Sequence, residues 1–418
     1  MQRRLRVAVV GGGAAGMITA HLLDEVHDVC VFEAHDQLGG NVRTLGSNVS
    51  SPAVPPDLRL DAGVIEFSPR NFRRFTALLR VLDVPTRRVS VTSAFLAGER
   101  GEIGSPEKTW RSGGGPCAIL GGWLRLAALA PRVLAFRRVT ARLSTADLYR
   151  RRLGDLLGHD TASEWMRLLM VYAYSVPRAA IDDLPAALAV PTLRAFMGRP
   201  GWVSIDGGSY RYIAEIVARF SGEIRLATPV DRIERGGDGV TVTPRGGAPE
   251  RFDRVVVATT PGQVRRLLVD ASADEAARWA GWTDQEVEVL VHDDTGLYAR
   301  RGVSRYSEFD VVEAPAGYNA YLNRLAGLDE RGPRHFQLAY GLHDEVDPAC
   351  VLHRQRHRTP RYHHAAFRTR PEILATNGDR HTYFVGAYLG DGLHEGAAAS
   401  ADRVSGQLGG QRLTPLTP

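Results

Sequence analysis

The sequence of 418 residues predicts an α/β protein with two domains, one of them built on a parallel sheet. Residues 5–10 and 29–32 are short apolar runs rich in β-branched side chains, and residues 14–23 between them have helical composition. Strand, helix and strand in this order predict a βαβ unit with parallel strands. The chain is also longer than one small core requires, which favours a second domain.

A glycine cluster joins the first strand to the helix. Gly11, Gly13 and Gly16 fit GxGxxG, in which the glycines permit a tight turn, close approach of a pyrophosphate and close helix packing. The N–H groups and the dipole at the start of the helix then face the phosphates. Glu33 ends the second strand, where a carboxylate accepts hydrogen bonds from ribose hydroxyl groups. The predicted contacts of this unit with a dinucleotide are Gly11, Gly13, Ala14, Ala15, Gly16, Glu33 and Ala34.

The segment after Glu33 indicates which dinucleotide binds. It reads AHDQLGGNVRT, in which Gly39, Gly40 and Arg43 form a GGxxRT pattern. This pattern resembles that of the flavin amine oxidase superfamily. The resemblance implies that the paired glycines, Asn41 and the arginine contact the pyrophosphate of FAD. Because enzymes that bind NAD lack this second element, we expect FAD.

Further segments resemble the same superfamily in the same order along the chain. Residues 57–67 resemble the strand that passes the isoalloxazine ring, 224–244 a strand pair against adenine, and 252–261 the strand that returns to the nucleotide. Residues 382–410 resemble the closing strand, flavin loop and last helix, whose small residues would let the helix N-terminus approach the flavin. The implied contacts with FAD in these segments are Gly63, Val64, Ile65, Val230, Ala258, Gly386, Glu395, Gly396 and Ala397.

Within the superfamily, residues 287–301, 320–328 and 386–396 resemble a bacterial group of amine-oxidase-like proteins predicted to bind NAD or FAD, some of them linked to modified fatty acids. The chain departs from that group at the closing motif, where Gly396-Ala397 replaces Asp-Gly, and at Glu66, whose position is generally apolar. These departures argue against carrying the function of the group over unchanged.

The FAD segments also divide the chain into domains. We expect residues 1–85, 200–265 and 375–418 to build a discontinuous Rossmann-like FAD-binding domain. Residues 86–199 and 266–374 then build a substrate domain of mixed α+β structure, helical in its first part and strand-like in its second.

Four side chains are candidates for the chemistry. Glu66 is a carboxyl group on an otherwise apolar strand, where desolvation raises the pKa and suits the group to proton transfer; an ion pair that only positions the strand is the alternative. Arg324 is a natural partner for it, since a guanidinium orients a carboxylate or holds a carbonyl oxygen. The resemblance implies that Tyr388 and His394 flank the flavin loop, where each either acts in catalysis or only supports FAD.

Composition and spacing argue against several other classes. The net charge of +5 is small for the length, and no nucleic-acid motif accompanies it. The three cysteines have no metal-ligand or redox spacing. Four histidines at positions 353, 357, 363 and 364 lie among arginines that would repel a cation, so we expect a solvated basic surface and no metal.

The most apolar segment, residues 119–136, is interrupted by Arg125, Pro131 and Arg132. We expect a packed helix pair there, rather than a substrate tunnel or a membrane contact, and no stable membrane insertion. No signal-peptide cleavage pattern is visible at the N-terminus, which predicts a cytoplasmic protein.

The sequence therefore predicts an FAD-dependent oxidoreductase. It would remove a hydride from a C–N centre of an amine or amide, or from an acyl C–C centre, of a small metabolite, with O₂ reoxidising the flavin. Imine formation in a natural-product pathway is one version of this chemistry. Two alternatives stay open: a flavin-dependent double-bond isomerase or fatty-acyl desaturase, and a flavin-binding protein without turnover. A homodimer also stays open.

Overall fold

The computed structural model describes residues 3–63, 65–90, 92–98, 101–111, 115–198, 201–303 and 305–414. The predicted βαβ unit forms, with β1 (Arg6–Val10), α1 (Ala14–Leu23) and β2 (Asp28–Phe32). The two strands pair in parallel, with Ala8 opposite Cys30. Val64, a predicted FAD contact, lies outside the described residues.

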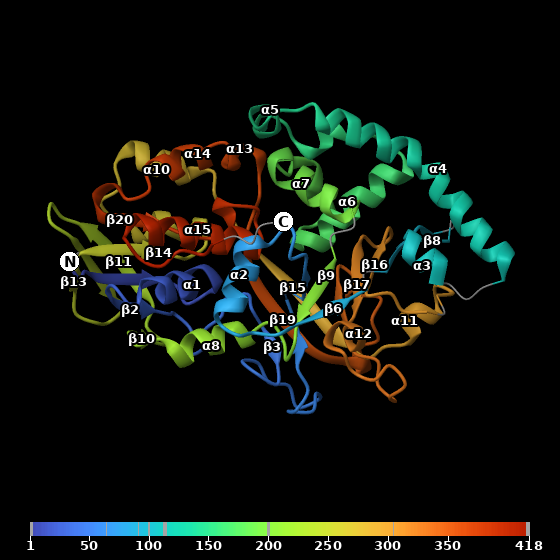
Figure 1. The fold of residues 1–418 in the computed structure, drawn as a ribbon, viewed down its shortest axis with the longest axis horizontal. Helices are drawn as coiled ribbons and strands as arrows, with labels where there is room; N and C mark the ends of the chain where they lie inside the picture. Colours follow the sequence, from blue (N-terminus) through green and yellow to red (C-terminus); the bar gives the residue numbers. More distant parts are fainter. Residues whose placement is uncertain are drawn as a thin grey trace.

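β1 lies at the centre of a parallel sheet that gathers distant segments of the chain (Figure 1). The strand order in the described residues is β10 (Glu223–Arg225), β2, β1, β14 (Arg254–Val257) and β20 (Thr382–Phe384). The strands come from the three ranges expected to build the FAD-binding domain. The domain limits themselves stay predictions.

Both faces of this sheet are covered. Val7 and Val9 face a core shared with α1, α2 (Arg73–Val81), α8 (Arg211–Arg219) and α15 (His394–Gln407). Ala8 and Val10 belong to a second core, which also contains residues of the small sheet β11 (Val230–Arg235), β12 (Val240–Pro244) and β13 (Glu250–Phe252). Burial on two sides explains why these strands are continuous apolar runs rather than alternating ones.

A larger sheet forms the centre of the other half of the molecule. Its order in the described residues is β19 (Val351–Pro360), β15 (Asp284–His292), β18 (Gln337–Tyr340), β17 (Gly317–Tyr321), β16 (Phe309–Val312), β7 (Ser93–Leu96) and β8 (Glu102–Gly104). Only β16 and β7 pair in parallel among these strands. A small sheet of β5 (Glu66–Phe67), β9 (Trp202–Ile205) and β6 (Thr86–Val89) connects the two halves.

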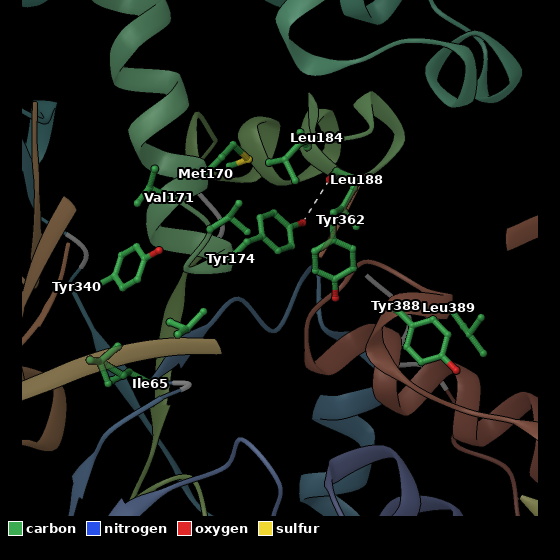
Figure 2. Packing of buried hydrophobic residues seen from close by; sticks show 14 of the residues in the cluster. Ile65, Met170, Val171, Tyr174, Leu184, Leu188, Tyr340, Tyr362, Tyr388 and Leu389 are labelled. Carbon is green, nitrogen blue, oxygen red and sulfur yellow. Dashed lines mark hydrogen bonds between the residues drawn. The ribbon is translucent and has the colours of Figure 1, made fainter. Parts of the chain in front are cut away.

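A helical insert lies at one end of the larger sheet (Figure 1). It consists of α4 (Pro116–Ala141), α5 (Thr145–Arg150), α6 (Thr161–Tyr174) and α7 (Ala186–Phe196). Figure 2 shows Tyr174 of α6 among buried residues of the insert, with Tyr362 and Tyr388 from the C-terminal part of the chain nearby. One apolar core therefore extends from the insert to the FAD-binding half.

The remaining helices and strands are short. They are α3 (Pro106–Arg111), α9 (Pro261–Leu267), α10 (Ala273–Ala280), α11 (Gly296–Ala299), α12 (Leu322–Ala326), α13 (His364–Phe367), α14 (Arg370–Ala375), β3 (Thr44–Leu45) and β4 (Leu60–Asp61).

The prediction for residues 119–136 is wrong. These residues lie in the single helix α4, which continues through Pro131 and has much of its apolar surface exposed. The expected helical structure forms, but as one helix rather than a pair, and in the described residues α4 packs against α6 and α3 over only part of its length. In the described chain, α4 is also the one helix that is long and apolar enough to cross a membrane by length and composition.

Candidate active site

Two glycine segments meet at the carboxyl end of β1. Gly13 forms a bridge with Gly39 of the second segment, and a Cβ at Gly16 would collide with the carbonyl oxygen of Gly11. By contrast, a Cβ at Gly13 would have only one atom within 4 Å, the Cα of Gly40 at 3.8 Å. The backbone at Gly13 is therefore not covered by protein side chains, as close approach of a phosphate requires.

The start of α1 carries no group that would compete with an anion. Its N-cap is Gly13, no side chain caps it, and its first turn, which contains Ala14 and Ala15, has no acidic residue. The free N–H groups and the helix dipole attract phosphate at such a terminus. Ala258 closes the turn from the side, because its N–H donates to the carbonyl oxygen of Val10 (2.8 Å).

Arg43 is a buried cation without a counterion. It is 8% exposed, and no carboxylate oxygen of the described residues lies within 4.0 Å of its guanidinium. Burial lowers its pKa, while the more distant Glu33 acts in the opposite direction. A buried charge without a partner is costly, and a pyrophosphate would supply the missing negative charge.

Glu33 lies at the end of β2, beside the segment that leads into β11. Its carboxylate accepts a hydrogen bond from the N–H of Gly12 (2.7 Å), and its carbonyl oxygen accepts one from Thr228 (2.8 Å). Val230 begins β11 two residues later, and Ala34 is exposed. The residues expected at the ribose and the adenine are therefore close together.

The Glu66 carboxyl group contacts the helical insert. The hydroxyl group of Tyr172, on α6, donates a hydrogen bond to Oε1 of Glu66. Burial raises the pKa of Glu66 to about 7; the Tyr172 hydrogen bond lowers it and the charge of Glu308 raises it further. Among the described residues no lysine or arginine forms an ion pair with Glu66, so the strand-positioning ion pair considered as an alternative is absent there.

Aromatic rings surround Tyr172. Its ring stacks on Phe309, with centroids 3.8 Å apart, and meets Tyr318 edge to face at 4.9 Å. Phe196 lies edge-on to Tyr172 and stacks on Trp202 at 5.3 Å. Sequence reasoning missed these residues because they lie on α6, α7, β9, β16 and β17, which carry no cofactor motif.

Arg324 pairs with other carboxylates. Its Nη2 lies 2.7 Å from Oε2 of Glu330, and its Nη1 lies 3.6 Å from Oε2 of Glu308. Glu308 is completely buried and also accepts a hydrogen bond from the N–H of Thr92 (2.7 Å). The hypothesised contact between Arg324 and Glu66 is therefore wrong, because the fully buried Glu308 requires the guanidinium.

Residues 14–281 match the family model for flavin containing amine oxidoreductase, which is more than half of the chain. The chain belongs to this family. The resemblance stated from the motifs, the FAD cofactor and the class of FAD-dependent oxidoreductase are thereby confirmed at the level of the family.

The chain is also similar to individual proteins. It is 28% identical over 275 residues to AofH of Mycobacterium tuberculosis (strain CDC 1551 / Oshkosh), a protein assigned as a flavin-containing monoamine oxidase. That match covers 61% of this chain and 57% of AofH, so it spans little more than half of the relative.

Two of the solved structures that share the fold of this chain are informative. Putrescine oxidase bound to putrescine has a TM-score of 0.69 at 14% identity, and the CLA-producing fatty acid isomerase from P. acnes has 0.69 at 17%. Each comparison covers 97% of this chain and 99% of the other. At these identities the likeness establishes the fold alone, and it confirms the predicted fold class.

The residues of this site fit FAD. The open backbone at Gly13 and the buried Arg43 cation would hold the pyrophosphate, and the Glu33 carboxylate would hold the ribose. The phosphate side of the site is connected to the segment that carries the Glu66 carboxyl group, because the N–H of Ala62 donates to the carbonyl oxygen of Arg43 (2.8 Å). Glu66 follows four residues later, within about 14 Å of chain.

In the closing segment of the chain, hydrogen bonds from backbone N–H groups to side chains join a loop to the start of α15. The N–H of Gly386 donates to Oγ of Ser400 (3.0 Å), and the N–H of Gly396 donates to Oδ1 of Asp391 (2.7 Å). Ala397, in the same turn as Gly396, is buried. The structure thus gathers these predicted cofactor residues where the last helix begins.

Glu395 turns away from this loop. Its carboxylate accepts hydrogen bonds from the N–H groups of Arg74 (2.9 Å) and Phe75 (3.1 Å) at the start of α2. Burial raises its pKa to about 7. Its contacts are those of a helix cap.

His394 is packed in the core between α2, α8 and α15. Its ring lies 4.8 Å from that of Phe75, and its Nε2 is 3.1 Å from the hydroxyl group of Tyr212. Burial lowers its pKa to about 4, so the ring is neutral near pH 7. These contacts favour the supporting role over the catalytic one.

Tyr388 is buried beside Trp279 and Trp282. Burial raises its pKa, and its hydroxyl group has no hydrogen-bond partner among the described residues. A buried hydroxyl group without a partner is costly, and a bound cofactor or substrate could supply one.

His357 corrects the prediction for the histidine cluster. It is 7% exposed, and its Nε2 bonds to the carbonyl oxygen of Ala62 (2.5 Å). A Cβ at Gly63 would lie 3.1 Å from the ring, so His357 supports the segment that leads to Ile65. Burial lowers its pKa to about 4. The expectation of a solvated surface is therefore wrong for this histidine, because β19 packs against the cofactor segment.

Proposed function

We propose that this chain oxidises a small amine at the carbon beside the nitrogen, and that Glu66 accepts the proton of the substrate ammonium group. The observation that carries the proposal is the Glu66 carboxyl group, which has a pKa of about 7 and no cation beside it in the described residues. A cationic substrate supplies the charge that the protein does not.

The proton transfer balances within the site. An ammonium group has no free lone pair on nitrogen, and the lone pair assists loss of a hydride from the neighbouring carbon. Transfer of one proton to the Glu66 carboxylate leaves a neutral amine and a neutral carboxylic acid, so both charges disappear where burial disfavours them. When bound, FAD supplies the two-electron acceptor. We propose O₂ as the final acceptor.

The aromatic rings favour an amine with an apolar substituent. Tyr172, whose hydroxyl group bonds to Glu66, has one ring face stacked on Phe309 and meets Tyr318 edge to face, so the carboxyl group adjoins an aromatic cluster. Ring faces attract an ammonium group and the apolar carbon chain next to it. A cation held between a carboxylate and aromatic rings has its reacting carbon restricted in position, which favours reaction.

Amides and acyl chains are weaker candidates. Arg324 was expected to hold a carbonyl oxygen, but Glu330 and Glu308 already pair with it. A neutral amide or acyl chain also brings no cation for Glu66. Oxidation of an amide to an imine in a natural-product pathway therefore lacks the free guanidinium that was expected to hold the amide carbonyl oxygen.

The experiment is an anaerobic absorbance titration of the FAD-loaded protein with a panel of primary and secondary amines, their N-acyl derivatives and unsaturated fatty acids. We expect apolar amines to bleach the visible flavin band, N-acyl derivatives to leave it unchanged, and air to restore it. Glu66→Gln should retain FAD and slow bleaching by on the order of 100-fold. The matched control is Glu330→Gln, which changes an exposed carboxylate that pairs with Arg324.

The other outcomes separate the alternatives. A fatty acid converted under nitrogen without net bleaching would establish a double-bond isomerase, and bleaching by an acyl chain would establish a desaturase. If FAD is bound and no compound reduces it or is converted, the protein binds flavin without turnover. Equal rates for wild type and Glu66→Gln would remove Glu66 from the proposal.

A further inference from the structure

Helix α4 presents a large apolar face to solvent. Figure 1 shows it along the periphery of the helical insert, reaching out beyond the larger sheet. The exposed fractions are 60% for Leu120, 40% for Trp123, 63% for Leu124 and 48% for Leu134. Large apolar side chains gathered on one helix mark an interaction surface.

The opposite face of α4 is part of the protein core. Leu126 and Leu129 pack against the main core, and Phe136 and Thr140 are buried. Their spacing of three, seven and four residues keeps them on one side of the helix. Crossing a membrane would remove this face from the core, so α4 is suited to lie on a membrane rather than to cross it.

The surroundings of this apolar face are strongly basic. Residues 108–152 contain ten arginines and lysines and one acidic residue, Asp147. Four of the ten, Lys108, Arg111, Arg132 and Arg152, form ion pairs with carboxylates outside this range. Arg137 and Arg138 near the end of α4 and Arg142 directly after it are exposed and form no ion pair among the described residues. Their charge is therefore available to an anionic partner.

We propose that the outward face of α4 docks the protein on an anionic phospholipid surface. Leu120, Trp123 and Leu124 would enter the interface between headgroups and acyl chains, while the three arginines contact lipid phosphates. A second copy of the chain fits less well. An isologous dimer through this face would bring two copies of Arg137, Arg138 and Arg142 into one interface, and none of the three pairs with a carboxylate in the described residues.

The test is cosedimentation of the FAD-loaded full-length protein with vesicles of phosphatidylcholine alone and with phosphatidylglycerol added. We expect binding only with the anionic lipid, and weaker binding as salt increases. Leu120→Gln with Leu124→Gln should reduce lipid affinity at least about tenfold. Arg137→Gln, Arg138→Gln and Arg142→Gln together should reduce it about 100-fold. Quenching of Trp123 by brominated lipid, lost in Trp123→Phe, would locate the contact.

The matched control is Leu226→Gln with Val269→Gln, which changes two exposed apolar side chains (42% and 48%) outside the helical insert. It should bind vesicles as the wild type does. Flavin absorbance and melting temperature show that each variant is folded. Lack of vesicle binding by the wild type, equal binding to both vesicle types, or a dimer that Leu120→Gln and Leu124→Gln dissociate would each overturn the proposal. Because the experiment measures lipid binding, a result that overturns this proposal does not contradict the proposed amine oxidation.

Discussion

The hydroxyl group of Tyr172 donates a hydrogen bond to the Glu66 carboxyl group across 106 positions of sequence. Tyr172 lies on α6 of the helical insert, and Glu66 lies on β5, four residues after the segment that bonds to Arg43. The contact therefore joins the cofactor half of the molecule to the helical insert at the one carboxyl group proposed to move a proton.

Tyr172→Phe should change the pH profile of turnover. The lost hydrogen bond lowers the pKa of Glu66 in the wild type, so its removal raises that pKa. Because the proposed base acts as a carboxylate, the acid limb of the kcat/KM profile should move to higher pH by about one unit. Tyr174→Phe is the control, since its hydroxyl group contacts Thr192 and the carbonyl oxygen of Asp391 instead. The same displacement in both variants would contradict a specific effect on Glu66.

Glu66 should also make the stability of the cofactor-free protein depend on pH. Its folded pKa of about 7 lies above the ordinary value of 4.5. Between these values the folded state holds a proton that the unfolded chain releases, so the contribution of Glu66 to stability is full below 4.5 and decreases as pH rises to about 7. Thermal melts of Glu66→Gln should therefore show a gain in Tm over wild type that increases from acidic to neutral pH. A gain independent of pH would show that this carboxyl group does not titrate as assigned.

Arg324→Gln should act on stability through Glu308. Removing one partner of a buried ion pair leaves an uncompensated charge and costs about 3 kcal/mol. The double variant Arg324→Gln with Glu308→Gln should recover much of this loss, as measured by urea denaturation. An additive loss in the double variant would mean that the two side chains stabilise the fold independently.

Arg43→Gln should separate cofactor affinity from folding. Without FAD the variant should melt at or above the wild-type temperature, because it lacks a buried cation that has no carboxylate partner. FAD affinity, measured by fluorescence titration, should fall between about 10- and 100-fold. Arg232→Gln, which removes an exposed ion pair with Glu234, is the control. Unchanged FAD affinity in Arg43→Gln would place the pyrophosphate elsewhere.

Two glycines of the first loop should respond differently to alanine. Gly16→Ala should prevent folding of the βαβ unit, because its Cβ would collide with the carbonyl oxygen of Gly11. Gly13→Ala should fold at a cost of about 1 kcal/mol as a helix N-cap but lose FAD, because its Cβ occupies open backbone surface. Circular dichroism and flavin content distinguish the two outcomes. If the Gly13→Ala protein binds FAD as fully as the wild type does, the phosphate site assigned to Gly13 is wrong.

The cofactor half of the site is proposed from short motifs that act locally. Gly13, Gly39 and Arg43 lie in two contiguous motifs, and their chemistry depends on backbone conformation within a few residues of each. The prediction of a solvated surface is wrong for His357, because nothing near this residue in the sequence shows that β19 packs on Gly63. The cytoplasmic location stays a prediction.

The sequence by itself determined the βαβ unit, the FAD motifs and the family, because apolar periodicity and glycine conformation act locally. Only the tertiary structure decided which charged groups meet. Arg324 pairs with Glu308 rather than Glu66, and Glu66 contacts Tyr172, because the order of strands and the position of α6 set those distances. It also decided that α4 packs on one face only. Residue types show which groups could pair or be buried, whereas the choice among distant partners follows from the assembled sheets.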